Sequence, residues 1–135
     1  MQNEKLAKLT VFAPTVVRIG VSLVFLWFGS SQLGDVQAWT AWLPAWTAAL
    51  PMSGETLVRL NGSFEVLFGI LLLLGFYIRP VALLLALHMF QIAFMVGYGE
   101  IGVRDFGLAM ATTSVFFYGA DRFTLDSFLA GRGSR

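Results

Sequence analysis

Four long stretches of the 135-residue sequence are almost free of charged side chains, and they limit what this chain can fold into more than any other feature. The stretches are residues 9–34, 60–78, 81–99 and 106–120. Only Arg18 and Glu65 interrupt them with a charge. A helix rises about 1.5 Å per residue, so about 20 apolar residues cross the hydrocarbon core of a bilayer. With its flanking residues, each stretch is long enough for one crossing.

The crossings are predicted to be helices rather than strands. A bilayer core holds no water for backbone N–H and C=O groups, so a spanning segment must satisfy them internally. The apolar residues do not alternate with the period of two that a transmembrane strand requires. We therefore predict an all-α fold, in which residues 1–135 form one integral membrane domain, a bundle of four transmembrane helices. The helices are expected at about residues 12–34, 56–78, 80–99 and 103–120.

The composition excludes several classes of protein. Hydrophobic residues make up 57% of the chain and charged residues 13%, whereas a soluble domain is about 25% charged. The net charge of +1 gives no electrostatic basis for binding nucleic acid. The chain has no cysteine, and His88 is its only histidine. We therefore expect no metal site and no intrinsic cofactor, because ligands for an iron–sulfur cluster or a bis-histidine haem are lacking.

Proline and glycine mark the breaks between the predicted helices. Arg79-Pro80 is expected to separate the second and third helices in a very short hairpin. The segment 36–54 is uncharged, but two prolines prevent a continuous helix. Its three tryptophans recur at helical spacing, and tryptophan prefers the membrane–water interface. We interpret 36–54 as an outer interfacial Trp-rich segment that either covers the bundle as a lid or only anchors it.

Lysine and arginine positions predict the orientation. With the N-terminus inside, most of these residues collect on the inner side, and cytoplasmic loops carry an excess of Lys and Arg. The inner set is Lys5, Lys8, Arg79, Arg122, Arg132 and Arg135. We therefore predict a multi-pass protein of the inner (cytoplasmic) membrane with both termini in the cytoplasm.

Each predicted helix carries one stripe of polar or small residues at heptad spacing. Such stripes favour close helix packing with polar bonds across the interface. From the helical rise, Glu65, His88 and Gln91 are expected to meet near the bilayer midplane. Arg18 is expected in the inner leaflet, about one turn below His88. The candidate site for a proton or a ligand is Glu65, His88, Gln91 and Arg18.

Two interpretations of these residues stay open. An ionisable residue inside a membrane is by default a functional-site hypothesis, which favours proton handling or ligand binding by Glu65 and His88. The alternative is that they only join helices through hydrogen bonds. Near the outer boundary we expect a second polar cluster, interpreted as structural ion pairs with an acidic residue at a helix N-terminus. This outer cluster is Gln32, Arg59, Arg104 and Asp105.

Several short motifs resemble those of the DoxX family. In order along the chain they are RIG and FGSSQL within 18–33, NGSFEVLFG at 61–69, VRDFGLA at 103–109 and GADRFTLD at 119–126. The resemblance spans about residues 17–126. It implies a four-helix protein of prokaryotic inner membranes, and relatives include a small subunit of thiosulfate:quinone oxidoreductase. The family residues fall on Arg18, Glu65, Arg104 and Asp105, while Gln32 stands where members often have Lys.

The resemblance implies a subunit associated with quinone-linked oxidoreductase chemistry, with a quinone or a similar apolar ligand bound in the polar-lined core of the bundle. Its partners would then be the lipid bilayer and either a protein of a membrane complex or further copies of this chain. The chain could not pass electrons by itself, so whether it is an enzyme stays open. The main alternative is a non-enzymatic membrane anchor or assembly factor. A small proton-coupled transporter is disfavoured, because no clear internal repeat is present.

Overall fold

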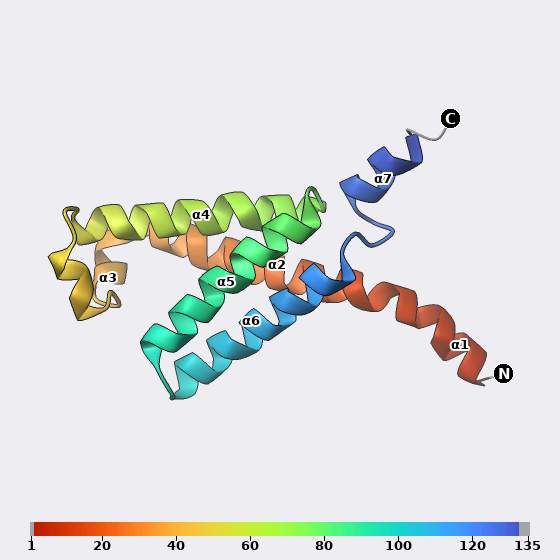
Figure 1. Cartoon of the computed structure of the whole chain (residues 1–135), viewed down its shortest axis with the longest axis horizontal. Coiled ribbons are helices and arrows are strands. Elements are labelled where there is room, and N and C mark those ends of the chain that lie inside the picture. The colour runs from red at the N-terminus through yellow and green to blue at the C-terminus, as the bar shows by residue number, and fades with distance from the viewer. Residues whose placement is uncertain (1, 133–135) are drawn as a thin grey trace.

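A computed structural model describes residues 2–132, and within that range the chain is helical with no strand (Figure 1). The four long helices are α2 (Ala13–Gly34), α4 (Gly54–Leu74), α5 (Ile78–Val96) and α6 (Glu100–Tyr118). The shorter elements are α1 (Gln2–Leu9), η1 (Thr10–Phe12), α3 (Val36–Thr40), η2 (Ala45–Ala49) and α7 (Leu125–Arg132). The prediction of an all-helical fold is confirmed.

Three of the helical segments are long and apolar enough to cross a membrane. They are Leu6–Gly34, Gly54–Leu74 and Ile78–Val96. The fourth long helix, α6, has 19 residues but begins with the charged side chains of Glu100, Arg104 and Asp105. Length and hydropathy therefore support three of the four predicted spans directly.

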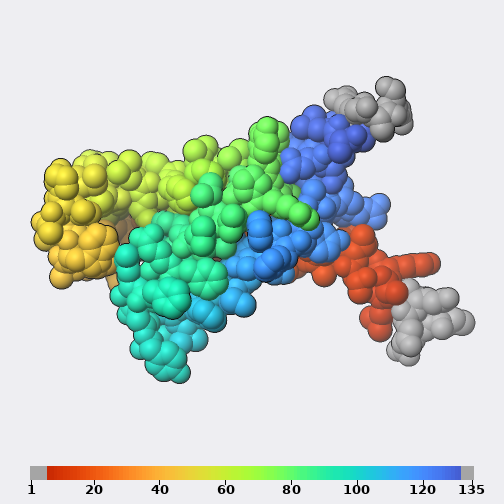
Figure 2. All heavy atoms as spheres, viewed as in Figure 1, coloured from red at the N-terminus to blue at the C-terminus, as the bar shows by residue number. Residues whose placement is uncertain are grey.

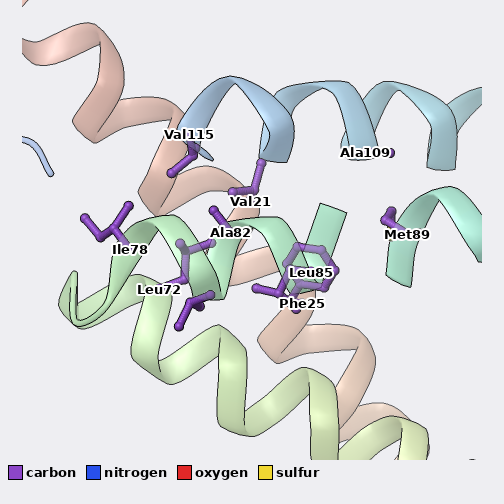
Figure 3. Close-up of a cluster of buried hydrophobic side chains, with 10 residues drawn as sticks. Val21, Phe25, Leu72, Ile78, Ala82, Leu85, Met89, Ala109 and Val115 are labelled. Carbon is purple, nitrogen blue, oxygen red and sulfur yellow. The ribbon is translucent and has the colours of Figure 1, made fainter. Parts of the chain in front are cut away.

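The long helices pack in two antiparallel pairs, α2 with α4 and α5 with α6. The pairs meet where α6 contacts α2 and α5 contacts α4 (Figure 1). Side chains from all four helices fill the meeting point, among them Phe25, Leu72, Leu85 and Ala109 (Figure 3). We call the end of the molecule at which both termini lie the α7 end, and the opposite end, with α3, the α3 end.

Small residues set the close contact between α2 and α4. A β-carbon on Gly29 would lie 2.7 Å from the Gly62 carbonyl oxygen and 2.9 Å from the backbone nitrogen of Val66. A β-carbon on Gly62 would lie 3.0 Å from the Gly29 carbonyl oxygen. These helices can approach so closely only because neither position has a side chain.

The break between α4 and α5 differs from the prediction. It lies at residues 75–77 rather than at Arg79-Pro80, because Gly75 ends α4 in the left-handed region with φ of 73°. Pro80 is instead the third residue of α5, where a missing N–H costs little. The Asp126 carboxylate accepts hydrogen bonds from the N–H groups of Tyr77 and Ile78, both 2.9 Å, and so caps α5. The other long helices deviate from their predicted bounds by only a few residues.

A buried guanidinium ties three parts of the chain together at the α7 end. Arg18 on α2 is 2% exposed, and its Nε donates to Oδ2 of Asp121 over 2.7 Å. Its Nη1 donates to the carbonyls of Leu72, at 3.0 Å, and Leu73. Its Nη2 donates to the carbonyl of Phe123 over 3.2 Å. The two leucine carbonyls belong to the last turn of α4, where backbone donors are scarce. The Leu72 carbonyl also accepts from the Gly75 N–H over 3.1 Å, and Arg18 adds a donor to both carbonyls.

The charge on Asp121 matches this arrangement. Burial by itself would raise the pKa of Asp121, but bonds from Arg18 and the Phe123 N–H and the positive charge of Arg18 hold that pKa below the ordinary value. A carboxylate with a lowered pKa stabilises the fold above its unfolded-state pKa, and this stabilisation is lost as the pH falls through the lowered folded-state pKa.

The glycine contact can be tested with Gly29→Ala. We expect this variant to lose about 1–3 kcal/mol of folding free energy, because the added methyl meets backbone atoms that cannot move independently. Gly20→Ala, also on α2, is the matched control, since nothing lies within 4 Å of its β-carbon position. Thermal unfolding in detergent measures both. Equal stability of the two variants would contradict the close contact.

The Arg18–Asp121 pair predicts a particular acid sensitivity. The wild-type unfolding temperature should fall as the pH is lowered through about 4 and below, because Asp121 becomes protonated. Asp121→Asn should be less stable at neutral pH and lose less on acidification. Asp35→Asn is the control, because Asp35 is the exposed N-cap residue of α3 and Asn can also cap a helix. An unchanged acid dependence in Asp121→Asn would show that this pair does not control it.

Candidate functional site

A cavity of about 440 Å³ lies between the long helices toward the α3 end. Most of its lining is aliphatic or aromatic, with Phe25, Phe28 and Met89 among the side chains. A small number of polar side chains converge on it, which is typical of a binding site for an apolar ligand with a few polar atoms. The amide and ionisable groups in the lining are Gln32, Asn61, Glu65, His88, Gln91, Arg104 and Asp105.

The Trp-rich segment forms one wall of this cavity. Trp39 in α3 donates its indole N–H to Oγ of Ser31 over 3.2 Å and packs edge-on against Phe28, with ring centroids 6.0 Å apart. Trp42 and Trp46 also line the cavity while remaining 64% and 51% exposed. The segment therefore contributes side chains directly to the lining of the cavity.

Glu65 is the centre of the polar lining. It lies on α4 and is 3% exposed. Its Oε2 accepts from the Gln32 amide over 2.9 Å, and its Oε1 accepts from Asn61 over 3.2 Å. Asn61 also donates to the side-chain oxygen Oε1 of Gln32 over 2.7 Å. Two neutral amides therefore orient the carboxyl group and join α2 to α4.

His88 on α5 completes this network. Its Nε2 lies 3.2 Å from Oε1 of Glu65, and its ring packs on Phe64 with centroids 4.8 Å apart. The His88 side chain is 15% exposed, and its Nδ1 has no bonding partner among the described residues. Within that part of the chain no Lys or Arg forms an ion pair with Glu65. Glu65 and His88 therefore form a hydrogen-bonded pair of an acid and an imidazole beside the cavity.

The structure separates the other two members of the predicted site. Gln91 lines the same cavity, but its amide contacts the Met95 sulfur at 3.9 Å rather than Glu65. Arg18 lies at the α7 end, bound to Asp121 and to backbone carbonyls. Because all of those bonds are within the fold, the geometry gives Arg18 a structural role there and does not bring it to Glu65.

The predicted outer cluster is likewise divided. Arg104 donates to Oδ1 of the adjacent Asp105, with the Nη2 of Arg104 at 2.7 Å, and its guanidinium lies 5.1 Å above the Phe28 ring. Arg59 is instead 3.7 Å from Glu55 one turn away, and both side chains are largely exposed. Gln32, assigned to this cluster from its depth, belongs to the Glu65 network. Of the four residues predicted for this cluster, Arg104 and Asp105 alone pair with each other, and both line the cavity.

Sequence reasoning left Asn61 and Asp121 out of the candidate residues. The signal for Asn61 is its position four residues before Glu65, on the same helix face. The signal for Asp121 is the need of a buried arginine for a carboxylate. No group of three His, Asp or Glu residues able to hold a metal occurs among the described residues.

Comparison with known proteins supports the resemblance seen in the motifs. A sequence model of the DoxX family matches residues 13–98, from the start of α2 to just beyond α5, and this range contains the Glu65 network and the Trp-rich segment. No curated protein and no solved structure gave a significant match. Because the matched range is more than half of the chain, the protein belongs to the DoxX family.

Proposed function

We propose that this DoxX protein spans the membrane four times and binds a quinone, or a similar apolar ring compound, in the cavity beside Glu65 and His88. The observation that carries the proposal is the combination in one cavity of apolar walls with a buried, hydrogen-bonded acid–histidine pair. Such a cavity is suited to a flat apolar ring that carries a few polar oxygen atoms.

The fourth span is supported by the surface of α6. Its exposed side chains include Phe106, Met110 and Phe117, at 47%, 51% and 73% exposure, and these would face lipid. The charged residues of α6 are confined to its first turns, where a helix end meets the interface. Four crossings return the chain to the side on which it began, in keeping with both termini at the α7 end (Figure 1). The lysines and arginines of that end favour the cytoplasmic side of the inner membrane.

Particular side chains would hold the ring. His88 would bond a ring oxygen through Nδ1, because its Nε2 is used by Glu65. Gln91 would offer a second polar contact from the next turn of α5. Phe25, Phe28 and Trp39 would pack against the ring and keep water away from it. A quinone, when bound, supplies reversible redox chemistry that takes up two electrons and two protons.

The protonation states of Glu65 and His88 would serve that chemistry. The pair can donate or accept a proton at the cavity wall, and the amides of Gln32 and Asn61 keep the carboxyl group in place. With no cysteine and one histidine, the chain offers few groups for carrying electrons. A partner protein of a membrane oxidoreductase complex would therefore act as the electron donor, and this chain would be its quinone-binding subunit.

The role of Glu65 can be tested by Glu65→Gln. This change keeps the shape of the side chain but replaces one of its two acceptor oxygens with an NH2 donor and removes the group that can exchange a proton. We expect quinone affinity to fall by about tenfold, since the amide cannot keep every hydrogen bond that orients His88 toward the ring and one such bond contributes about 1 kcal/mol. Glu55→Gln, an exposed carboxylate on the same helix, is the matched control. Titration of purified protein with a short-chain quinone, with mass spectrometry of co-purified lipid, provides the measurement.

Two results would contradict the quinone proposal. One is wild-type protein that contains no quinone and binds none when it is added. The other is equal quinone binding by Glu65→Gln and the wild type, which would separate ligand binding from the Glu65–His88 pair. The first result would favour the anchor or assembly role.

The location of the ligand can be tested separately by filling the cavity. Ile92 lines it from α5 and is partly buried. Ile92→Trp should lower quinone affinity by roughly tenfold, because the indole occupies ring volume, and it should leave the helical circular dichroism spectrum unchanged. Leu87→Trp, on a lipid-facing position of the same helix, is the control. Equal loss of affinity in both variants would place the ligand outside this cavity.

A further inference from the structure

A second, smaller hollow, which we call the groove, lies at the α7 end, between η1, the first turns of α2 and the last turns of α6. It has a volume of about 230 Å³ and is lined largely by apolar side chains, including Pro14, Val17, Val115 and Tyr118. It is separate from the cavity of the proposed quinone site and shares no lining residue with it. The surrounding surface is also apolar, since Leu9 and Val16 are 61% and 66% exposed.

One arginine lies against this groove, and a second follows shortly after the groove residue Gly119 in the sequence. The guanidinium of Arg79 lies over Gly119, a groove residue, so closely that a β-carbon there would be 2.7 Å from Nε. Arg122 follows three residues later, and its Cζ is 5.3 Å from the centroid of the Phe123 ring. Phe123 in turn stacks on Phe12, at 5.8 Å between centroids, directly before the groove residue Ala13.

No carboxylate with a described side chain balances the positive charges at this position. Among residues whose side chains the structure describes, no carboxylate forms an ion pair with Arg79 or Arg122, and both arginines are exposed. The two nearby carboxylates have other bonding partners, since Asp121 binds Arg18 and Asp126 caps α5. The exposed Lys8 adds a further positive charge two residues before the groove begins.

We propose that this groove binds an anionic phospholipid, with one acyl chain between η1–α2 and α6 and the headgroup phosphate bound by Arg79 and Arg122. Charge complementarity identifies the occupant, because an unpaired guanidinium binds phosphate oxygens through charge-assisted hydrogen bonds. The apolar floor of the groove requires that the phosphate carry a hydrocarbon chain. The lipid would connect α2, α5 and α6 at the same end of the molecule at which Arg18 connects α2 to α4. In Figure 2 the segments of α1 and α7 project from this end of the molecule.

The experiment compares the unfolding temperature of detergent-purified protein with phosphatidylglycerol, phosphatidylcholine or inorganic phosphate added. We expect phosphatidylglycerol alone to raise it, since a ligand that binds only the folded state stabilises that state. Arg79→Gln/Arg122→Gln should weaken the lipid affinity obtained from this titration by roughly tenfold or more. Arg59→Gln, an exposed arginine at the α3 end, should behave as the wild type. Ser114→Leu, which fills the groove and keeps both charges, should weaken the same affinity.

Several outcomes would overturn the proposal. An equal response to phosphatidylcholine would show that charge recognition is absent. An equal response to inorganic phosphate would show a site for a soluble anion instead of a lipid. An unchanged phosphatidylglycerol response in both the double arginine variant and Ser114→Leu would show that the lipid binds elsewhere. If the double variant does not fold, an unchanged response in Ser114→Leu is sufficient to reject the groove.

Discussion

The buried guanidinium of Arg18 is the interaction on which the arrangement of the helices most depends. A buried charge without partners is costly, and removal of one partner from a buried pair typically costs about 3–5 kcal/mol. Arg18, on α2, avoids this cost only when the last turn of α4 and the segment after α6 are both in place, because its bonding partners come from those two parts. Since lipid provides no hydrophobic force between helices, such directional bonds have particular weight in fixing which helix packs where.

The Glu65 site depends on a second constraint, the glycine contact between α2 and α4. Gly29 is three residues before Gln32, and Gly62 is three residues before Glu65. Because the helices are antiparallel, these two side chains start on opposite sides of the glycine contact, and the close approach lets the Gln32 amide reach the Glu65 carboxyl over 2.9 Å. Without it, the Glu65 carboxyl would lack its amide partner from α2. The chain therefore has a structural charged pair at one end and a cavity with an acid–histidine pair toward the other. A lipid bound beside Arg79 would reinforce the structural end and leave the cavity accessible.

Much of the fold could be predicted from the sequence, because long apolar stretches leave the backbone few options in a membrane. The long helices are close to where the charges and the glycines indicate. The turn between α4 and α5 was predicted at Arg79-Pro80, because proline is the strongest local signal for a break. That prediction was wrong, since a proline in the first turn of a helix is tolerated while Gly75 and the Asp126 cap define the boundary. The capping carboxylate is nearly 50 residues away in the sequence, and no local pattern indicates it.

The sequence by itself determined that this chain is helical and apolar, and that Glu65 and His88 lie inside apolar segments. Helical rise also placed them at similar depth, which is why their contact could be expected. Only the tertiary structure decided which polar groups are partners. Arg18 pairs with Asp121 across 103 residues, and Gln32 joins Glu65 instead of Arg104. The depth of a residue along a helix follows from counting residues. Which partner its side chain meets depends instead on how neighbouring helices are rotated and how they cross. The rotation and crossing are set by packing at positions such as Gly29 and Gly62.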